Sequence, residues 1–385
     1  MGDQQTQRTG YVYADTLLQY RFHNKHPFNQ MRLKLTTELL LSTGLLQPTQ
    51  IIKPRIATED EIATVHKYDY IQAIKRGERN LLNPDEKSKY GLDDEDTHVF
   101  PRIHKSAANI VGGGLNLIDA IMDGQFDNGC HLGGGLHHAL EGRANGFCVY
   151  NDAAIYIHHL IHNYGQRVLY VDTDAHHGDG VQWRFYTSND VMNYSIHETG
   201  KFLFPGSGHY TERGDDQGFG YTVNVPLEPY TEHESFMTVF KDTLEAVATT
   251  FNPDFVISVN GSDIHYLDPL THMHCDLNTL YEIPYFVNEI AKKYANGKIV
   301  MLGGGGYNIW RVVPRAWSHV YLSLIDHPPL EGRLPEAWLS KWKHYSPVPI
   351  PENWEESFPD YTSIPRIAEI TQKNLSVATK IKNWF

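Results

Sequence analysis

Five ionisable side chains follow one short apolar run near the middle of the chain. Residues 168–171 are apolar, and the polar residues after them are Asp172, Asp174, His176, His177 and Asp179. Such a run indicates a buried strand, and strand alternation would place Asp172, Asp174 and His176 on one side of the chain. Carboxylate and imidazole groups this close together favour a divalent metal such as zinc. The alternative is a loop of solvated charges, but buried strands seldom end in such a cluster without a function.

Two further apolar runs end in residues that could join this cluster. Residues 255–259 are followed by Asn-Gly-Ser-Asp263, and residues 298–302 are followed by a glycine turn that ends at Tyr307. The carboxyl ends of parallel strands meet at one edge of a sheet, where ligands bind in this class of fold. We therefore expect Asp263 and Tyr307 to lie beside the first cluster.

These residue types predict hydrolysis of an amide or ester. An open catalytic zinc site takes three protein ligands and a water molecule, and Asp174, His176 and Asp263 would supply the three ligands. A neutral histidine would accept the proton of the water, and a second histidine would need a carboxylate to fix its tautomer. The hydroxyl of Tyr307 could donate a hydrogen bond to the developing oxyanion. A pair of adjacent histidines, His137 and His138, follows three glycines earlier in the chain.

The elements that position these residues are expected to alternate between strands and helices. Strands are predicted near 10–13, 168–171, 191–197, 221–227, 255–259 and 298–302, and helices near 29–42, 107–122, 153–163, 231–249 and 312–325. This alternation predicts an α/β fold with a mainly parallel sheet covered on both faces. Three glycines at 112–114 indicate that another element packs closely against their helix.

The remaining segments indicate a single domain, residues 1–385, because no Gly/Ser-rich or Pro-rich linker divides the first 340 residues. We expect its core at about 10–325, a long polar loop at 76–104 and a C-terminal strap over the surface at about 340–385, rich in proline and aromatics over 345–366. Within the polar loop, four acids at 93–96 are typical of a solvated face.

Composition excludes some functions and partners. Among 385 residues, 33 Lys and Arg face 46 Asp and Glu, a net charge of −13, which argues against direct binding to nucleic acid but not against a basic protein substrate. No apolar run has the length of a signal peptide or membrane span. The three cysteines, Cys130, Cys148 and Cys275, lack zinc-site spacing and predict a reducing, cytoplasmic location.

Five motifs, in this order, resemble the zinc-dependent histone deacetylase family. They are Gly-Gly-Gly-Leu-His-His-Ala (133–139), Gly-Phe-Cys-Val-Tyr-Asn-Asp (146–152), Asp-Thr-Asp-Ala-His-His-Gly-Asp-Gly (172–180), Gly-Ser-Asp (261–263) with Asp-Pro-Leu (268–270), and Gly-Gly-Gly-Gly-Tyr (303–307). The likeness runs from about Tyr11 to Leu324. Within the family the chain is most similar to the bacterial acetoin-utilisation deacetylases, partly through its compact length and the sequence Ser-Asp-Ile-His265.

The resemblance implies a three-layer arginase/deacetylase-like fold with the site at the C-terminal strand ends. It also implies that a metal-activated water removes the acetyl group from Nε-acetyl-lysine of proteins. The implied metal is Zn²⁺, with Fe²⁺ as the alternative in the cell, bound by Asp174, His176 and Asp263. In the implied catalytic set, His138 is the general base, Asp179 orients it, Asp172 orients His137, and Tyr307 stabilises the transition state.

The family likeness implies further binding residues. Those for substrate are Phe147 and Phe204 in the tunnel walls, Leu270 at the rim, Gly135 with its carbonyl, Asp96 for the substrate backbone and Arg32 beside an acetate channel. Those for K⁺ are Asp172, Asp174, His176, Ser195 and Ile196 near the zinc, and Phe185, Ser188, Val191 and Tyr221 further away. Cys148 is expected to be a buried thiol. His265 departs from the usual animal pattern; a supporting or surface position is expected, with a metal role as the alternative.

Three other functions are open at this point. One is arginase-like hydrolysis with two manganese ions, although His177 and Gly178 stand where that pattern places a carboxylate sooner. Another is a catalytically silent binding protein, which the presence of all three ligands and Tyr307 disfavours. The third is a deacetylase of acetylpolyamines or other small amides, which would share the same zinc site. The oligomeric state is not readable from the sequence.

Overall fold

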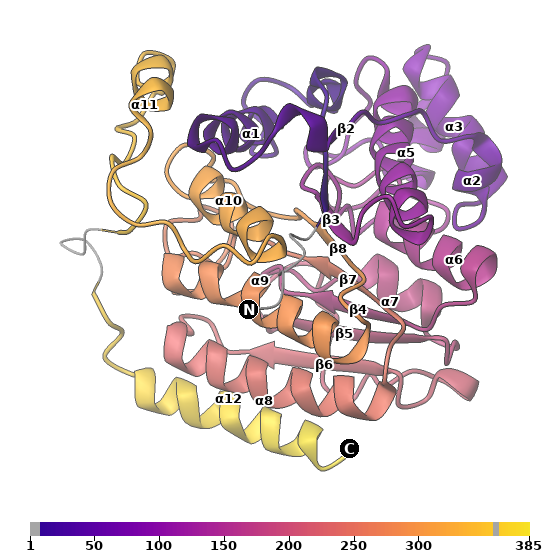
Figure 1. Ribbon diagram of the computed structural model, residues 1–385. Helices are drawn as coiled ribbons and strands as arrows, with labels where there is room; N and C mark the ends of the chain where they lie inside the picture. Colours follow the sequence, from indigo (N-terminus) through magenta and orange to yellow (C-terminus); the bar gives the residue numbers. More distant parts are fainter. Residues whose placement is uncertain (1–7, 357–361) are drawn as a thin grey trace.

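Eight parallel strands form one sheet in the computed structural model, which describes residues 8–356 and 362–385 (Figure 1). The order across the sheet is β2-β1-β3-β8-β7-β4-β5-β6, and every neighbouring pair is parallel. Their bounds are β1 Thr9–Val12, β2 Ile51–Ile52, β3 Asn128–His131, β4 Val168–Asp172, β5 Val191–Glu198, β6 Thr222–Leu227, β7 Phe255–Val259 and β8 Ile299–Leu302. The sheet is therefore wholly parallel, and the C-terminal ends of all its strands lie along one edge.

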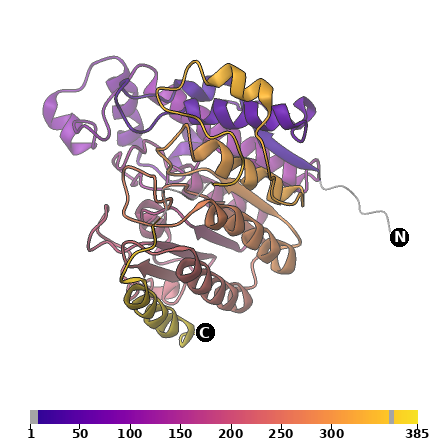
Figure 2. The ribbon, with the colours of Figure 1, turned by 90° about the vertical axis from the view of Figure 1, so that its left-hand side faces the viewer.

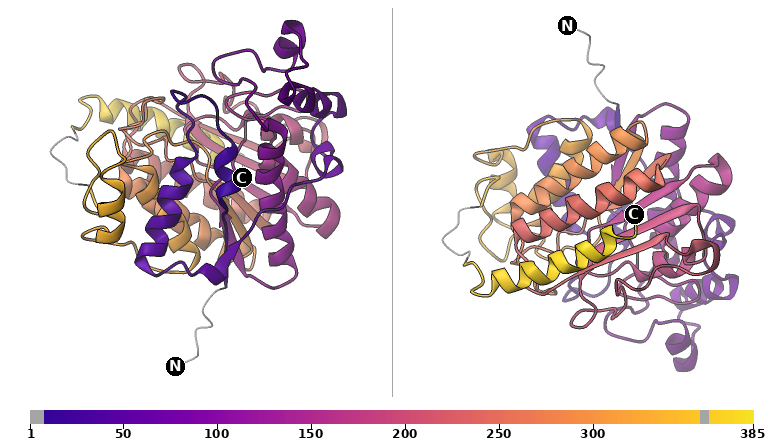
Figure 3. Two further views of the ribbon diagram at one scale, coloured as in Figure 1. Left: turned by 90° about the horizontal axis from the view of Figure 1, so that it is seen from above. Right: turned by 90° about the horizontal axis from the view of Figure 1, so that it is seen from below.

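Helices cover both faces of the sheet (Figure 3). On one face, α5 (Ile103–Met122), α6 (Asp152–Tyr164) and α7 (Asp179–Phe185) pack against the strands, with α2 (Glu59–Ala63) and α3 (Tyr68–Glu78) outside them. The other face carries α1 (Met31–Thr43), α8 (His233–Phe251), α9 (Leu277–Tyr294) and α10 (Val313–Leu324). The expected arginase/deacetylase-like three-layer α/β architecture is confirmed.

Burial on both faces explains the composition of the central strands. Every residue of β4, β5 and β7 is buried, as in parallel sheets that helices cover on both sides. The glycines of α5 permit close contact between helices, because a Cβ at Gly114 would lie only 2.1 Å from the ring of Tyr156 on α6. The expected close packing against residues 112–114 is thus confirmed.

Two segments differ from expectation. The region 76–104, which was predicted as a loop, contains a helix, α4 (Pro84–Lys89). Helix α5 begins at Ile103, just before the end of that region. A capping box starts α4: Asn83 Oδ1 accepts from the Glu86 N–H at 2.9 Å, and the Glu86 carboxylate accepts from the Asn83 N–H at 3.1 Å. The C-terminal strap predicted from about residue 340 begins within a helix, α11 (Glu336–Trp342), and contains a second helix, α12 (Ile367–Lys382).

The last helix closes the edge of the sheet. Helices α11 and α12 lie at opposite ends of the molecule (Figures 1 and 2), and α12 packs on α8 and on the edge strand β6. An edge strand leaves unpaired backbone groups that need cover. Asn374, fully buried on α12, accepts from the Glu228 N–H at 3.0 Å and donates to the hydroxyls of Thr231 and Ser235 at 2.8 and 3.0 Å.

No helix in the described part of the chain has both the length and the apolarity needed to cross a membrane.

The substitution Asn374→Ala should lower the free energy of unfolding by about 1–3 kcal/mol, because it leaves buried polar groups without partners. Urea unfolding followed by circular dichroism measures this change. Ser376→Ala, an exposed position on the same helix, is the matched control and should shift the free energy by less than about 0.5 kcal/mol. Equal values for the two variants would contradict the anchoring role of Asn374.

Candidate metal centre and active site

The candidate site lies at the C-terminal ends of four neighbouring strands, β3, β8, β7 and β4. Each strand delivers one of the predicted groups. The histidine pair His137 and His138 follows β3, Tyr307 follows β8, and Asp263 follows β7, while Asp174 and His176 follow β4. Stretches far apart in the sequence therefore meet at the middle of one sheet edge, as predicted.

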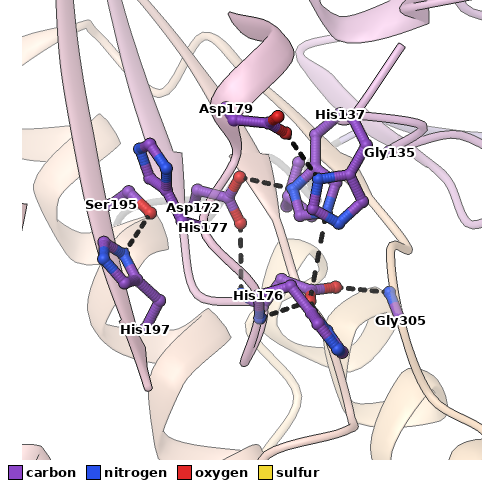
Figure 4. Close-up of polar contacts among 12 residues, drawn as sticks. Gly135, His137, Asp172, His176, His177, Asp179, Ser195, His197 and Gly305 are labelled. Carbon is purple, nitrogen blue, oxygen red and sulfur yellow. Dashed lines mark hydrogen bonds and ion pairs between the residues drawn. The ribbon is translucent and has the colours of Figure 1, made fainter. Parts of the chain in front are cut away.

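Asp174, His176 and Asp263 form a compact, buried group of metal-ligand atoms. One ligand atom from each lies within 4.8 Å of the other two. The Nδ1 atom of His176 lies 3.1 Å from Oδ1 of Asp174 and 2.9 Å from Oδ2 of Asp263. Backbone N–H groups fix the carboxylates: Ala175 donates to Asp263 at 3.0 Å, and Gly305 donates to Asp174 (Figure 4).

The electrostatics of this group favour a cation at its centre. Burial lowers the pKa of His176, but hydrogen bonds to Asp174 and Asp263 outweigh it and raise the pKa well above the usual value. Burial, and then the neighbouring Asp174, raise the pKa of Asp263 to about 6. The two carboxylates thus stabilise positive charge at Nδ1. A metal ion in place of the proton would meet one nitrogen and two carboxylate oxygens, a donor set that fits Zn²⁺. Among the described residues this is the one such group of three.

Each histidine of the tandem pair has its own carboxylate. Nδ1 of His137 lies 2.7 Å from Oδ2 of Asp172, and Nδ1 of His138 lies 2.7 Å from Oδ1 of Asp179 (Figure 4). The ring centroids of the pair are 4.0 Å apart. All four side chains are buried. The structure thus brings together the two predicted histidine–aspartate pairs.

The two histidines differ in protonation. Burial lowers the pKa of His137, but the charges of Asp172 and Asp174 outweigh burial and raise the pKa to about 9. Burial lowers the pKa of His138 well below its usual value, and the neighbouring charges of His137 and His176 lower it further. Burial also raises the pKa of Asp179 to about 7. In the protein itself, His138 is therefore the neutral imidazole that can accept a proton.

Tyr307 is placed by a turn of glycines, and the packing at Gly305 leaves no room for a side chain. At Gly305 a Cβ atom would lie 2.2 Å from Oδ2 of Asp263. Asp268, buried next to the turn, accepts from the backbone N–H of Tyr307 at 2.9 Å and from that of Leu270 at 3.0 Å. Burial, and then Asp263 and Asp174, raise the pKa of Tyr307 well above 10, so its hydroxyl remains a donor.

Aromatic side chains stand on two sides of the site. The ring of Phe147 is edge-on to Tyr307 at 5.8 Å, and the ring of Phe204 is edge-on to His138 at 5.0 Å. Phe147 is half-buried, whereas Phe204 is exposed. The backbone of Gly135 has a positive φ of 91°, and its N–H donates to the buried carboxylate of Asp152 at 3.0 Å. The structure thus places Phe147 and Phe204, predicted as tunnel walls, on two sides of the site.

The remaining predicted substrate residues lie at different depths. Arg32 is buried, with its guanidinium over the rings of Phe28 and Trp317, and it donates to the Gly306 carbonyl at 3.0 Å. Burial lowers the pKa of Arg32 to about 10. Leu270 is half-buried in the loop after β7. Asp96 is exposed, and Nε2 of His26 donates to its backbone carbonyl at 3.1 Å.

The predicted K⁺ residues fall into two groups along β4 and β5. Asp172 pairs in register with Ser195 near the C-terminal strand ends, where Asp174, His176 and Ile196 also lie. The hydroxyl of Ser195 is hydrogen-bonded to Nδ1 of His197 at 2.8 Å (Figure 4). The second group lies at the other end of the sheet, at the end of α7 and the starts of β5 and β6: Phe185, Ser188, Val191 and Tyr221.

Two details correct the expectations from sequence. Strand β4 ends at Asp172, so strand alternation does not place Asp174 and His176; the turn after the strand does, through the hydrogen bond from the His176 N–H to Asp174 at 2.9 Å. Of the two positions expected for His265, supporting or surface, the surface one is wrong, and His265 is not a member of the metal-ligand group either. It is fully buried, with Nε2 3.0 Å from the carboxylate of Glu356.

Two functional supports were missed in the sequence. Neither Asp268 nor Asp152 had an assigned role, yet the carboxylates of both accept hydrogen bonds from backbone N–H groups beside the site. A signal for Asp152 was present, since a charged residue starts a helix directly after an apolar turn. Cys148 is buried, as expected.

Comparison with known proteins reveals extensive similarity. The histone deacetylase domain model matches residues 26–324. The chain is 63% identical to the acetoin utilization protein AcuC of Staphylococcus xylosus, over 98% of both chains. It is 45% identical to the protein of that name from Bacillus subtilis, over 96% of this chain and 95% of the relative. The crystal structure of an HDAC homolog from Aquifex aeolicus superposes with a TM-score of 0.82 at 26% identity, covering 95% of this chain and 99% of that one.

Wild-type protein should bind one divalent ion per chain, and Asp263→Ala should lose most of it, because the substitution removes one of three ligands. Elemental analysis after dialysis measures this. Asp276→Ala, which removes a buried aspartate that caps α9, is the matched control and should keep its metal. Two tightly bound ions per wild-type chain, or full retention in Asp263→Ala, would contradict the assignment.

Proposed function

The chain belongs to the histone deacetylase family and is of the AcuC type, and from this premise we propose that it is a zinc-dependent hydrolase of Nε-acetyl-lysine in proteins. The observation that carries the proposal is the buried group of Asp174, His176 and Asp263 next to a neutral His138 and the hydroxyl of Tyr307. An ion held by the three ligands would supply Lewis-acid activation of a water molecule and of the acetyl carbonyl.

The histidine pair handles the proton. His138 is neutral and takes the proton of the attacking water, and it later delivers a proton to the leaving lysine amine. Its Nδ1 atom is bound by Asp179 at 2.7 Å, which directs Nε2 toward the site. His137, paired with Asp172 and positively charged, favours the negative charge that develops beside it.

The side chains and backbone groups that surround the site orient the substrate. Tyr307 donates to the oxyanion that forms from the acetyl carbonyl, and its turn is fixed by Asp268. Phe147 and Phe204 flank the lysine methylenes and keep water away. The carbonyl of Gly135 accepts from the acetamide N–H, and its backbone is fixed by the carboxylate of Asp152.

A second candidate is deacetylation of acetylpolyamines or other small amides. The observation in its favour is the exposed acidic run at residues 93–96, which would attract a small cationic amine as well as a basic peptide. The metal group and the histidine pair would serve both reactions, so only the rim distinguishes them.

The proposal includes the ions and the location. Zn²⁺ is the proposed catalytic ion, with Fe²⁺ as the alternative in the cell. K⁺ is proposed at the two groups of residues, one near the C-terminal ends of β4 and β5 beside the site and the other at the end of α7 and the starts of β5 and β6. Support for a cytoplasmic location comes from three free cysteines, all buried.

Tyr307→Phe should reduce kcat by about 10²–10³ while leaving fold and metal content unchanged, because only one oxyanion donor is removed. The measurement is steady-state hydrolysis of an acetyl-lysine peptide. Tyr164→Phe is the matched control: it removes a hydroxyl at the end of α6 that donates to Asp119 on α5, and it should keep wild-type activity. Activity of Tyr307→Phe within about threefold of wild type would assign oxyanion stabilisation to another group.

Asp96→Ala should lower kcat/KM on acetylated peptides by about 10- to 150-fold, because the carboxylate would accept two substrate backbone N–H groups. The exposed neighbour Asp93 is the control, and Asp93→Ala should change little. A small acetylated amine without a peptide backbone should be hydrolysed equally by both variants. Equal small effects on peptides would instead favour the small-amide function.

A further inference from the structure

An apolar groove of about 450 Å³ lies between the loops after β5 and β6 and the start of α12. Two of its aromatic side chains are unusually open to solvent: Phe202 is 61% exposed and Tyr230 is 48% exposed. Its other apolar residues are Pro229, Ile364 and Ile370. Large apolar side chains that gather in this way at a surface mark a binding site rather than packing.

The groove lies next to the two loops that carry Phe204 and Leu270. Phe202 stands two residues before Phe204, whose ring contacts His138, so their Cα atoms are at most about 7 Å apart. On the other side, the Tyr230 N–H donates to the carbonyl of His272 at 2.7 Å, two residues after Leu270. The two loops that carry Phe204 and Leu270 are therefore connected directly to the groove walls.

The charged residues of the groove are already paired. Lys373 contacts Glu228 at 2.9 Å, and Arg366 contacts Glu369 at 3.3 Å. These four are the charged side chains that line it. Their charges compensate one another, so a charged ligand would find no excess of either sign. The free surface offered to a ligand is aromatic and aliphatic.

The groove is formed before any ligand binds. Its C-terminal wall is held to the loop after β6 by the Ile364 N–H, which donates to Glu232 at 2.7 Å, and by the buried side chain of Asn374 on α12. Preorganised walls lose little conformational freedom on binding, which favours affinity.

We propose that this groove is a substrate subsite that binds an apolar side chain, aromatic or branched aliphatic, two or three residues from the acetyl-lysine. The inference rests on the proposed deacetylation of polypeptides and specifies which ones are preferred. An extended peptide advances about 3.3–3.6 Å per residue, so a side chain two residues away covers the separation between Phe204 and Phe202. A peptide with only polar side chains near the acetyl-lysine should bind more weakly, because it would leave the aromatic surface of the groove exposed to water.

The test uses a set of acetyl-lysine peptides with glycine at the flanking positions, in which phenylalanine replaces one glycine at a time from position −3 to +3. The steady-state rate at which the metal-loaded, full-length enzyme hydrolyses each peptide is measured. One position two or three residues from the acetyl-lysine should raise kcat/KM by about 5- to 20-fold, through KM rather than kcat. Phe202→Ala and Tyr230→Ala should remove this preference while hydrolysing the all-glycine peptide within about twofold of wild type.

Phe219→Ala is the matched control. Phe219 is equally exposed, at 61%, but it precedes β6 at the opposite end of that strand. This variant should retain the full preference for phenylalanine, and Phe202→Leu should retain most of it. An enzyme without preference at any position, or one whose preference survives in both Phe202→Ala and Tyr230→Ala, would overturn the subsite.

Direct binding separates this inference from the proposed function. If no acetyl-lysine peptide is hydrolysed, the proposed function fails, and the groove is then tested by fluorescence anisotropy with the labelled phenylalanine peptides. Weaker binding by Phe202→Ala than by Phe219→Ala would support the subsite. Equal dissociation constants for those two variants would overturn it.

Discussion

The structure depends on two buried carboxylates that are held around one imidazole nitrogen. Asp174 and Asp263 are both excluded from solvent, and two like charges in contact within the interior are unfavourable unless a cation or hydrogen-bond donors compensate them. The protein supplies donors from three directions, the N–H groups of Ala175, His176 and Gly305. A parallel sheet makes this possible, because neighbouring strands end side by side and each contributes its own loop.

This concentration of charge determines the protonation of its neighbours. His137 lies between Asp172 and Asp174, with Nε2 4.0 Å from the latter, and so it is stabilised as a cation. His138 lies beside that cation and is kept neutral. Two adjacent residues of the same type therefore acquire opposite roles from their environment alone, which is a recurring way of obtaining an acid and a base at one pH.

The sequence predicted the parts of the fold that have a local signal. Buried apolar runs predicted β4, β7 and β8, and the polar residues directly after them predicted the metal group. Strand β3 was not predicted, because Asn-Gly-Cys-His at 128–131 lacks an apolar pattern although all four residues are buried. Helix α9 was missed as well; it contains Pro284, which interrupts a helical pattern.

Residues whose role depends on distant contacts could not be predicted. His265 follows a metal ligand by two positions, which suggested proximity to the metal, yet its partner Glu356 lies 91 residues later in the chain. Asp268 holds Tyr307 across 39 residues. No local pattern encodes such pairs, because burial and hydrogen bonding are decided only when the loops after β7 and β8 pack against one another.

The part of the chain that matches the family model and the part beyond it contribute differently to the site. The matched domain, residues 26–324, contains both the metal group and the histidine pair. Beyond it, Glu356 binds His265 behind the metal loop, and Asn374 binds the loop after β6. The C-terminal segment is thus bonded to the loops around the site, and none of its described residues, up to 356 and from 362 on, belongs to the metal-ligand group. Because it also forms one wall of the apolar groove, changes in this segment can alter the surface beside the site while the metal-ligand group and the histidine pair remain the same.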